Sequence, residues 1–157
     1  MKKILIAAVI ALAAVSLRAD ADGYFMLSVF SPGQLPAPSS TIYGGRLSLI
    51  YGDCHELYGA DFGVAGSVRE RMNGAQFNLI WNGVGTDMAG FQAGVANTVE
   101  GYFAGLQLGL VSVADELYGC QIGLVNVTTH LYGCQIGLLN FATDREWTFW
   151  PFINIGW

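Results

Sequence analysis

A short unit recurs seven times along this chain, and it constrains the fold more than any other feature of the sequence. Each unit contains an anchor glycine, and successive anchors lie 14 to 16 residues apart. The anchors are Gly44, Gly59, Gly74, Gly90, Gly105, Gly119 and Gly133. The second residue after the anchor is glutamine in the last five units, namely Gln76, Gln92, Gln107, Gln121 and Gln135. Any fold assigned to this chain must account for a period this short and this regular.

Residue types alternate with a period of two within each unit, which is typical of β-strands and not of helices. In the sixth unit, Tyr118, Cys120, Ile122 and Leu124 alternate with Gly119, Gln121, Gly123 and Val125. One side of the strand is therefore apolar, with aromatic residues near its ends, and the middle of the other side is small and polar. Of the charged residues after position 21, only Arg46 and Asp61 fall inside the repeat strands. The sequence predicts an all-β chain with charged connectors.

A small antiparallel β-barrel of about eight strands, of the outer-membrane type, is the architecture that this pattern favours. Strands of about ten residues match the length that a transmembrane barrel strand needs. The apolar side would face lipid, and the glycine–glutamine side would line a narrow, filled interior. Arg46 and Asp61 take the place of the glutamine in the first two units. Inside a barrel each would need a partner, and the other residue is the expected one.

The carboxyl end provides an eighth strand after the seven repeats. It is rich in aromatic residues from Trp147 to the terminal Trp157. A final strand that ends in an aromatic residue resembles the recognition signal of bacterial outer-membrane proteins, so the outer-membrane assembly machinery is an expected partner. Pro151 has no amide hydrogen and would need a bulge or an edge position.

A β-solenoid, in which each unit of 14–16 residues forms one coil, is the alternative architecture. Equivalent residues would stack directly above one another, which would explain the row of glutamines. The extra residue between Gln76 and Asn82 fits more easily at a coil corner than inside a strand. In a solenoid we expect the apolar side to be buried and the glycine–glutamine side to face water.

Two cysteines distinguish the two architectures, because Cys120 and Cys134 occupy the same position of their repeats. Parallel coils would stack them about 4.8 Å apart, close enough for a disulfide to be considered. In an antiparallel hairpin Cys120 would instead neighbour Ile136. The favoured interpretation is that these cysteines are small apolar residues that fill one side of the strand.

The amino-terminal segment predicts export. Residues 1–21 combine a basic start, an apolar core and small residues near a cleavage site, which is typical of a secretory signal peptide. Residues 22–42 are expected to form an N-terminal strand and a proline-rich loop, and residues 43–157 the repeat domain. After residue 21 no apolar run is long enough for a membrane helix. The remaining charge is about −7, with no lysine, so nucleic acid is not an expected partner.

The repeat Gly-x-Gln-[Ile/Leu]-Gly-[Leu/Val]-x-Asn resembles that of bacterial surface-repeat proteins known from Leptospira and other Gram-negative groups, the LA_2272-type family. Residues 105–112, 119–126 and 133–140 carry the resemblance, and residues 150–157 resemble the usual ending of that family. The resemblance implies a location in the outer membrane or at the cell surface. It assigns no biochemical role.

No catalytic, metal-binding or cofactor-binding motif stands out, and the chain is not expected to be an enzyme. The residues expected to matter are structural: Gln76, Gln92, Gln107, Gln121, Gln135, Arg46, Asp61 and Trp157. The favoured function is a structural or interaction protein of the outer membrane or cell surface, with membrane lipid as a partner. An exported solenoid binding module is the first alternative. A small lipid-modifying barrel enzyme, using His130 with Thr128 or Thr129, is the second.

Overall fold

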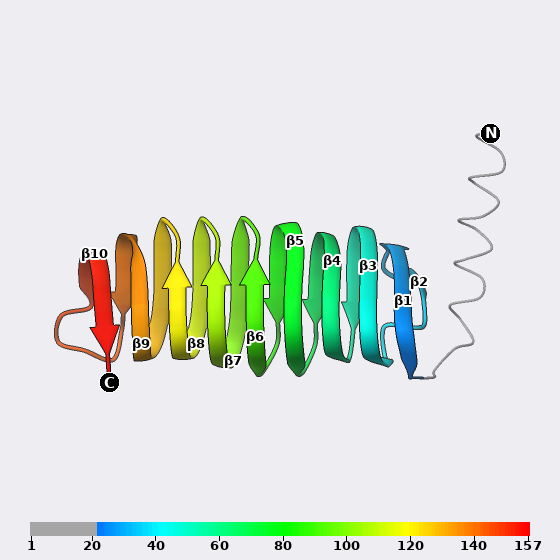
Figure 1. Ribbon diagram of the computed structural model, residues 1–157, viewed down its shortest axis with the longest axis horizontal. Coiled ribbons are helices and arrows are strands. Elements are labelled where there is room, and N and C mark those ends of the chain that lie inside the picture. The colour runs from blue at the N-terminus through cyan, green and yellow to red at the C-terminus, as the bar shows by residue number, and fades with distance from the viewer. Residues whose placement is uncertain (1–21) are drawn as a thin grey trace.

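The computed structural model describes residues 22–157, so the signal peptide expected at residues 1–21 lies outside the described residues. The described chain forms one ten-stranded sheet in the order β10-β9-β8-β7-β6-β5-β4-β3-β1-β2. The strands are β1 (Gly23–Phe30), β2 (Gly33–Leu35), β3 (Thr41–Cys54), β4 (Glu56–Val68), β5 (Met72–Val84), β6 (Met88–Ala93), β7 (Ala96–Leu108), β8 (Val111–Ile122), β9 (Val125–Ala142) and β10 (Phe149–Gly156). Neighbouring strands from β3 to β9 are parallel, and the chain advances by one coil per repeat (Figure 1).

Each coil has two sheet faces and two edges. The anchor face holds the anchor glycines and comprises residues 117–122 in the sixth coil, and the return face comprises residues 125–128 of the same coil. The apolar edge, at residues 123 and 124, joins the two faces and is drawn uppermost in Figure 1. The charged edge, at residues 129 and 130, leads into the next coil along the lower side of the figure. Equivalent residues stack in register from coil to coil, as Gly119 does with Gly133.

The coils stack in parallel, as the β-solenoid alternative predicts. The prediction of a β-barrel is not confirmed. The predicted all-β repeat architecture is present, but the strands do not alternate in direction. Parallel, in-register coils place every glutamine beside its equivalent in the next coil, as in the pairing of Gln107 with Gln121. The side-chain amide of one coil can therefore bond to the amide of the next along the whole stack.

The orientation of the two strand sides corrects the expectation for a solenoid. The glycine–glutamine side faces inward and the apolar side faces out. Gln107 and Gln121 are fully buried, whereas Phe62 is 47% exposed and Leu79 is 69% exposed. The space between the two faces is narrow and is filled by amides and glycines, so the large apolar side chains of the anchor face lie outside.

Two inward rows near the charged edge form the apolar core. One comes from the start of each coil and consists of Ile42, Leu57, Met72, Met88, Phe103, Leu117 and Leu131. The other comes from the end of the return face and includes Cys54, Val68, Val84, Val99, Ala114 and Ala142. This cluster fills the charged-edge half of the coil, and the polar rows fill the other half.

The anchor glycines are required by backbone conformation and by close stacking. Their φ angles lie between 136° and 155°, a region that residues with a side chain rarely adopt. A Cβ on Gly119 would also lie 2.0 Å from the carbonyl oxygen of Gly105, the anchor of the preceding coil. No side chain fits at this position, which explains why all seven repeats share it.

Both edges absorb differences in repeat length. At the charged edge, Glu100 and Gly101 lie where the next coil has only Asp115. At the apolar edge, the third coil is longer than the second. In the third coil Leu79 and Ile80 lie where the second coil has only Val64, and the register is restored on both sides of them. The extra residue expected at a coil corner is therefore found there, as a local bulge.

Both ends of the stack carry a terminal element. At the N-terminal end β1 stacks in parallel on β3, and β2 pairs with it in the antiparallel direction. Gln34 of β2 is buried and bonds through its side chain to the backbone of Asp53 in the first coil. At the C-terminal end β10 runs antiparallel to β9, with Ile153 beside Ile136 and Gly156 beside Gly133.

Candidate interaction surface

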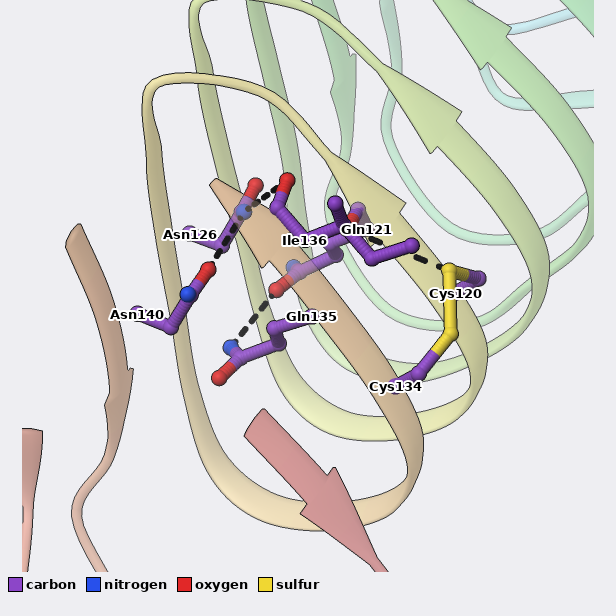
Figure 2. The surroundings of a disulfide bond; sticks show 7 residues. All are labelled: Cys120, Gln121, Asn126, Cys134, Gln135, Ile136 and Asn140. Atoms are coloured by element: carbon purple, nitrogen blue, oxygen red, sulfur yellow. Dashed lines mark hydrogen bonds between the residues drawn. A yellow bond between two sulfur atoms is a disulfide. The ribbon is translucent and has the colours of Figure 1, made fainter. Parts of the chain in front are cut away.

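The predicted glutamine row forms a continuous ladder inside the solenoid. Each Nε2 donates to the Oε1 of the glutamine one coil earlier, over distances of 2.7–2.9 Å, from Gln92 onto Gln76 through to Gln135 onto Gln121. Figure 2 shows the last of these bonds. Asn154 of β10 donates to Gln135 at 2.9 Å and so extends the ladder into the C-terminal strand. The side-chain amides therefore bond to one another in the absence of water, as buried polar groups must.

Arg46 and Asp61 terminate the ladder at its N-terminal end. Asp61 accepts hydrogen bonds from Gln76 at 3.2 Å and from Asn78 at 2.7 Å. Arg46 binds both carboxylate oxygens of Asp61, at 2.8 and 2.6 Å, and both side chains are fully buried. Burial opposes the charge on Arg46, yet the adjacent Asp61 carboxylate raises the pKa of the guanidinium above its ordinary value. The predicted pairing of these two residues is confirmed.

A second polar row runs along the return face and donates in the opposite direction. Asn82 Nδ2 donates to Asn97 at 2.8 Å, and Asn126 Nδ2 donates to Asn140 at 2.8 Å, in both cases towards the C-terminus. The same amide groups also bond across the coil, as Asn126 does to the carbonyl oxygen of Ile136 at 3.1 Å (Figure 2). The two rows hold the two faces together, and their amide dipoles oppose one another.

The outer surface of the anchor face, the apolar edge and the adjoining start of the return face forms a continuous apolar shell. We define the apolar shell as the aliphatic and phenylalanine side chains here that are more than a third exposed: Leu47, Leu49, Ile50, Phe62, Phe77, Leu79, Ile80, Val95, Leu110, Val111, Ile122, Leu124, Ile136, Leu138 and Leu139. Soluble monomers rarely expose a connected apolar patch of more than a few hundred Å². The apolar shell extends through all seven coils, so it is the strongest candidate for a binding surface.

The charged edge lies on the opposite side of every coil from the apolar edge. Acidic residues and arginines there form pairs between adjacent coils, including Arg69 with Asp53 and Arg71 with Asp87, the latter at 3.8 Å. Apart from the buried pair, residues 22–157 contain three arginines, no lysine and ten acidic residues. The charged edge is therefore acidic overall.

Tyrosines occupy the outward row between the charged edge and the apolar shell in the first two and the last two coils. In the three coils between them this row holds Asn73, Ala89 and Ala104. Tyr43 and Tyr58 stack in neighbouring coils with ring centroids 5.4 Å apart, and Tyr118 and Tyr132 stack at 4.5 Å. Gly156 pairs with Gly133, so the terminal Trp157 follows at the level of this row and is 94% exposed. In the coils that carry tyrosine, the surface changes from charged to aromatic to aliphatic from the charged edge upward.

A disulfide joins the outer surface of two adjacent coils. Cys120 and Cys134 stack in register with their Cα atoms 4.7 Å apart, and their sulfur atoms are bonded (Figure 2). The disulfide considered for parallel coils is present. The favoured interpretation, in which the two cysteines are only small apolar residues that fill one side of the strand, is therefore wrong. The bond lies on the anchor face, between the tyrosine row and the apolar shell.

The histidines and the third cysteine do not form a recognisable catalytic arrangement. His130 Nδ1 lies 3.2 Å from Asp144, but the Thr128 hydroxyl donates to the backbone oxygens of Asp115 and His130 and not to the imidazole. Cys54 points into the core, where burial raises the pKa of its thiol to about 11. Within residues 22–157, no group of three or more His, Cys, Asp or Glu side chains is placed to hold a metal ion.

Comparisons with known proteins assign no family to the chain. No family model, no curated protein and no solved structure matches it. Within residues 22–157 there is no helix long and apolar enough to cross a membrane.

The structure gathers most of the predicted structural residues into one network. The five ladder glutamines, Arg46 and Asp61 lie in a single internal hydrogen-bonded column, while Trp157 lies apart at the C-terminal end. The alternation assigned some members of the apolar shell, such as Leu47 and Ile122, to the apolar side. It placed Ile50 and Ile80 on the glycine–glutamine side, although both are exposed at the apolar edge. The sequence shows that each strand has two chemically distinct sides, but it does not show which side faces out.

Proposed function

We propose that this protein is an exported β-solenoid interaction module of the cell envelope, and that it acts by binding through its apolar shell. The observation that carries the proposal is the inversion of the usual pattern, with hydrogen-bonded amides inside and large aliphatic side chains outside. Leaving fifteen such side chains in water is costly, at about 25 cal/mol for each Å² of apolar surface. Covering the shell recovers that free energy without any change inside the coil.

Support for binding rather than catalysis comes from the regularity of the surface. The apolar shell repeats the same residue types in coil after coil, and such a surface is suited to an extended contact. The charged edge, with its exposed pairs, offers a second side that can remain in water. Export and an envelope location rest on the amino-terminal segment and on the resemblance of the repeat, and recognition of β10 by an assembly machinery stays a prediction.

Cell fractionation tests this proposal. The shell variant Leu110→Ser/Leu124→Ser/Leu138→Ser removes three half-exposed leucines from neighbouring coils without touching the interior. We expect the wild-type protein to need detergent for release from the envelope fraction, and the shell variant to be released without detergent.

A matched control changes three residues at the charged edge of the same part of the stack, as Glu100→Ser/Asp115→Ser/Thr129→Ser. This control is expected to fractionate like the wild type. Retention of the shell variant at the wild-type level would refute the proposed role of the apolar shell.

A further inference from the structure

We propose that the apolar shell is covered by the acyl chains of a single lipid leaflet, into which the solenoid inserts with its apolar edge leading and its charged edge in water. This inference rests on the proposed function and names the partner. Four features of the described residues favour lipid over a protein partner or a second copy of the chain.

The first feature is the extent of the apolar surface. Exposed apolar side chains cover the anchor face, continue around the apolar edge and reach the return face, where Val111 and Leu139 lie. The return face also carries Val113 and Val127 in its next outward row. A docked protein or a second solenoid would cover one face and leave the edge and the other face in water. A layer of acyl chains covers all three.

The second feature is the order of residue types from one edge to the other. Charged groups lie at one edge, and the aliphatic residues of the apolar shell lie at the other. Between them, the first two and the last two coils carry tyrosines. Aromatic residues with a polar group are favoured at the membrane–water interface, and aliphatic residues are favoured in the hydrocarbon. Trp157 adds a further aromatic ring at the level of Tyr132.

The third feature is the depth of the apolar region. From Tyr118 to Ile122 the strand advances four residues, which is about 13 Å at 3.3 Å per residue, and the corner residue Leu124 lies beyond it. The hydrocarbon core of a bilayer is about 30 Å thick, and each leaflet contributes half of it with an interfacial region above. A protein that spans the bilayer needs polar residues at both ends, whereas this solenoid has a single charged edge. The dimensions and the charge distribution both fit one leaflet.

The fourth feature is that backbone N–H and C=O groups at the apolar edge, which would lie deepest in the leaflet, are hydrogen-bonded within the protein. Polar backbone groups in hydrocarbon must be bonded within the protein. The corners of the apolar edge meet this need by stacking, with Leu110 donating to Val95 at 2.9 Å, Leu124 to Leu110 at 3.0 Å and Leu139 to Leu124 at 2.9 Å. The side-chain amides are sealed inside the coil.

The charge of the exposed edge predicts how lipid composition affects binding. With three arginines against ten acidic residues, this edge gains nothing from anionic headgroups. We therefore expect equal or stronger binding to phosphatidylcholine vesicles than to vesicles that also contain phosphatidylglycerol. Electrostatic adsorption to a membrane surface would produce the opposite order.

Vesicle flotation with protein purified from cells that express the full-length chain tests the inference. The wild type should float with phosphatidylcholine vesicles, and the Leu110→Glu/Leu124→Glu variant should float about tenfold less or lower, because a carboxylate is costly among acyl chains. Thr129→Glu places the same side chain at the charged edge and should float like the wild type. Circular dichroism confirms that each variant retains its β structure.

A depth measurement avoids any added charge. In a Cys54→Ala background, an environment-sensitive dye is attached to Leu124→Cys or to Thr129→Cys, and vesicles with brominated acyl chains serve as quencher. The dye at position 124 should be quenched strongly and the dye at position 129 weakly. Equal quenching at the two positions would overturn the edge-first orientation.

Failure of this inference can be separated from failure of the proposed function. If the wild type does not float but forms a dimer, the occupant is a second copy. If it neither floats nor dimerises, yet still needs detergent for release from cells, the occupant is an envelope protein. Either result overturns the lipid leaflet and leaves the interaction module intact. Both proposals fail if the serine shell variant is retained as strongly as the wild type, or if the wild type is released without detergent.

Discussion

At the scale of single residues, the interior is organised by the direction of its hydrogen bonds. Every glutamine of the ladder donates towards the N-terminus, so the row needs an acceptor at its first position. Asp61 provides that acceptor, and Arg46 neutralises it. The first two repeats have arginine and aspartate in place of glutamine, and these are the two repeats at which the ladder ends. A carboxylate is suited to that position because it accepts the last hydrogen bond of the ladder, and the arginine balances its charge.

The buried pair leads to a stability prediction. Asp61→Asn removes the negative charge and leaves the Arg46 guanidinium buried without a counter-charge. We expect the free energy of unfolding to fall by about 3–5 kcal/mol, measured by urea denaturation. The double variant Arg46→Met/Asp61→Gln removes both charges, keeps a side-chain oxygen as the acceptor for Gln76, and should lose less than the single variant. A single variant as stable as the wild type would contradict the role assigned to the pair.

At the scale of the structural element, the coil tolerates changes in length at its two edges. At the charged edge, Glu100 and Gly101 lie where the next coil has only Asp115. The apolar edge already accommodates one residue in the second coil and two in the third. The anchor face has no such freedom, because its residues alternate between the interior and the apolar shell.

Single-residue insertions test this difference. An alanine inserted between Leu110 and Val111, at the apolar edge, should lower the free energy of unfolding by about 1 kcal/mol or less, since a longer surface loop costs little. An alanine inserted between Leu106 and Gln107 shifts the alternation and exchanges inward and outward residues. That insertion should prevent folding or lower stability by several times as much in the same urea experiment. Equal effects of the two insertions would show that the coil is not in register as described.

The sequence predicted the strands and their two sides, but not the direction of pairing. Alternation along residues 117–122 depends on the chain alone, and it is present in the structure as expected. The corner at residues 123 and 124 was not predicted, so Val125, expected on the side of Gln121, faces outward. A spacing of 14–16 residues suits a ten-residue strand with a short link, and it equally suits one coil. The glutamine ladder through Gln121 favours parallel coils over antiparallel strands, because stacked amides bond continuously only when identical residues are in register.

The inward position of the glutamines was predicted for the barrel and not for the solenoid. The reason for the error is that a solenoid was assumed to bury its apolar side, as a soluble protein does. Here the inward rows beside the charged edge, such as Phe103 and Val99, provide the apolar core. The glutamines then fill the rest of the interior, and the apolar side of the anchor face remains outside.

At the scale of the whole molecule, the solenoid is amphipathic across its width. Tyrosines lie on the anchor face of the first two and the last two coils. One long edge is charged and acidic, and the opposite long edge is apolar. Each coil contacts only its neighbours, so this division is repeated along the whole length of the stack. The proposed binding to a lipid leaflet depends on this repetition, because no single coil exposes enough apolar surface to bind strongly.

Distances between spin labels along one outward row test the parallel stack most directly. Leu47, Leu108, Ile122 and Ile136 belong to the same row of the anchor face. In a background without native cysteines, pairs of labels at positions 47 and 108, 47 and 122, and 47 and 136 span four, five and six coils. At about 4.8 Å per coil, the distances should rise steadily from about 19 to about 24 and about 29 Å. In a closed antiparallel barrel the same series would stop rising and turn back as the strands return around the barrel, and that result would contradict the solenoid.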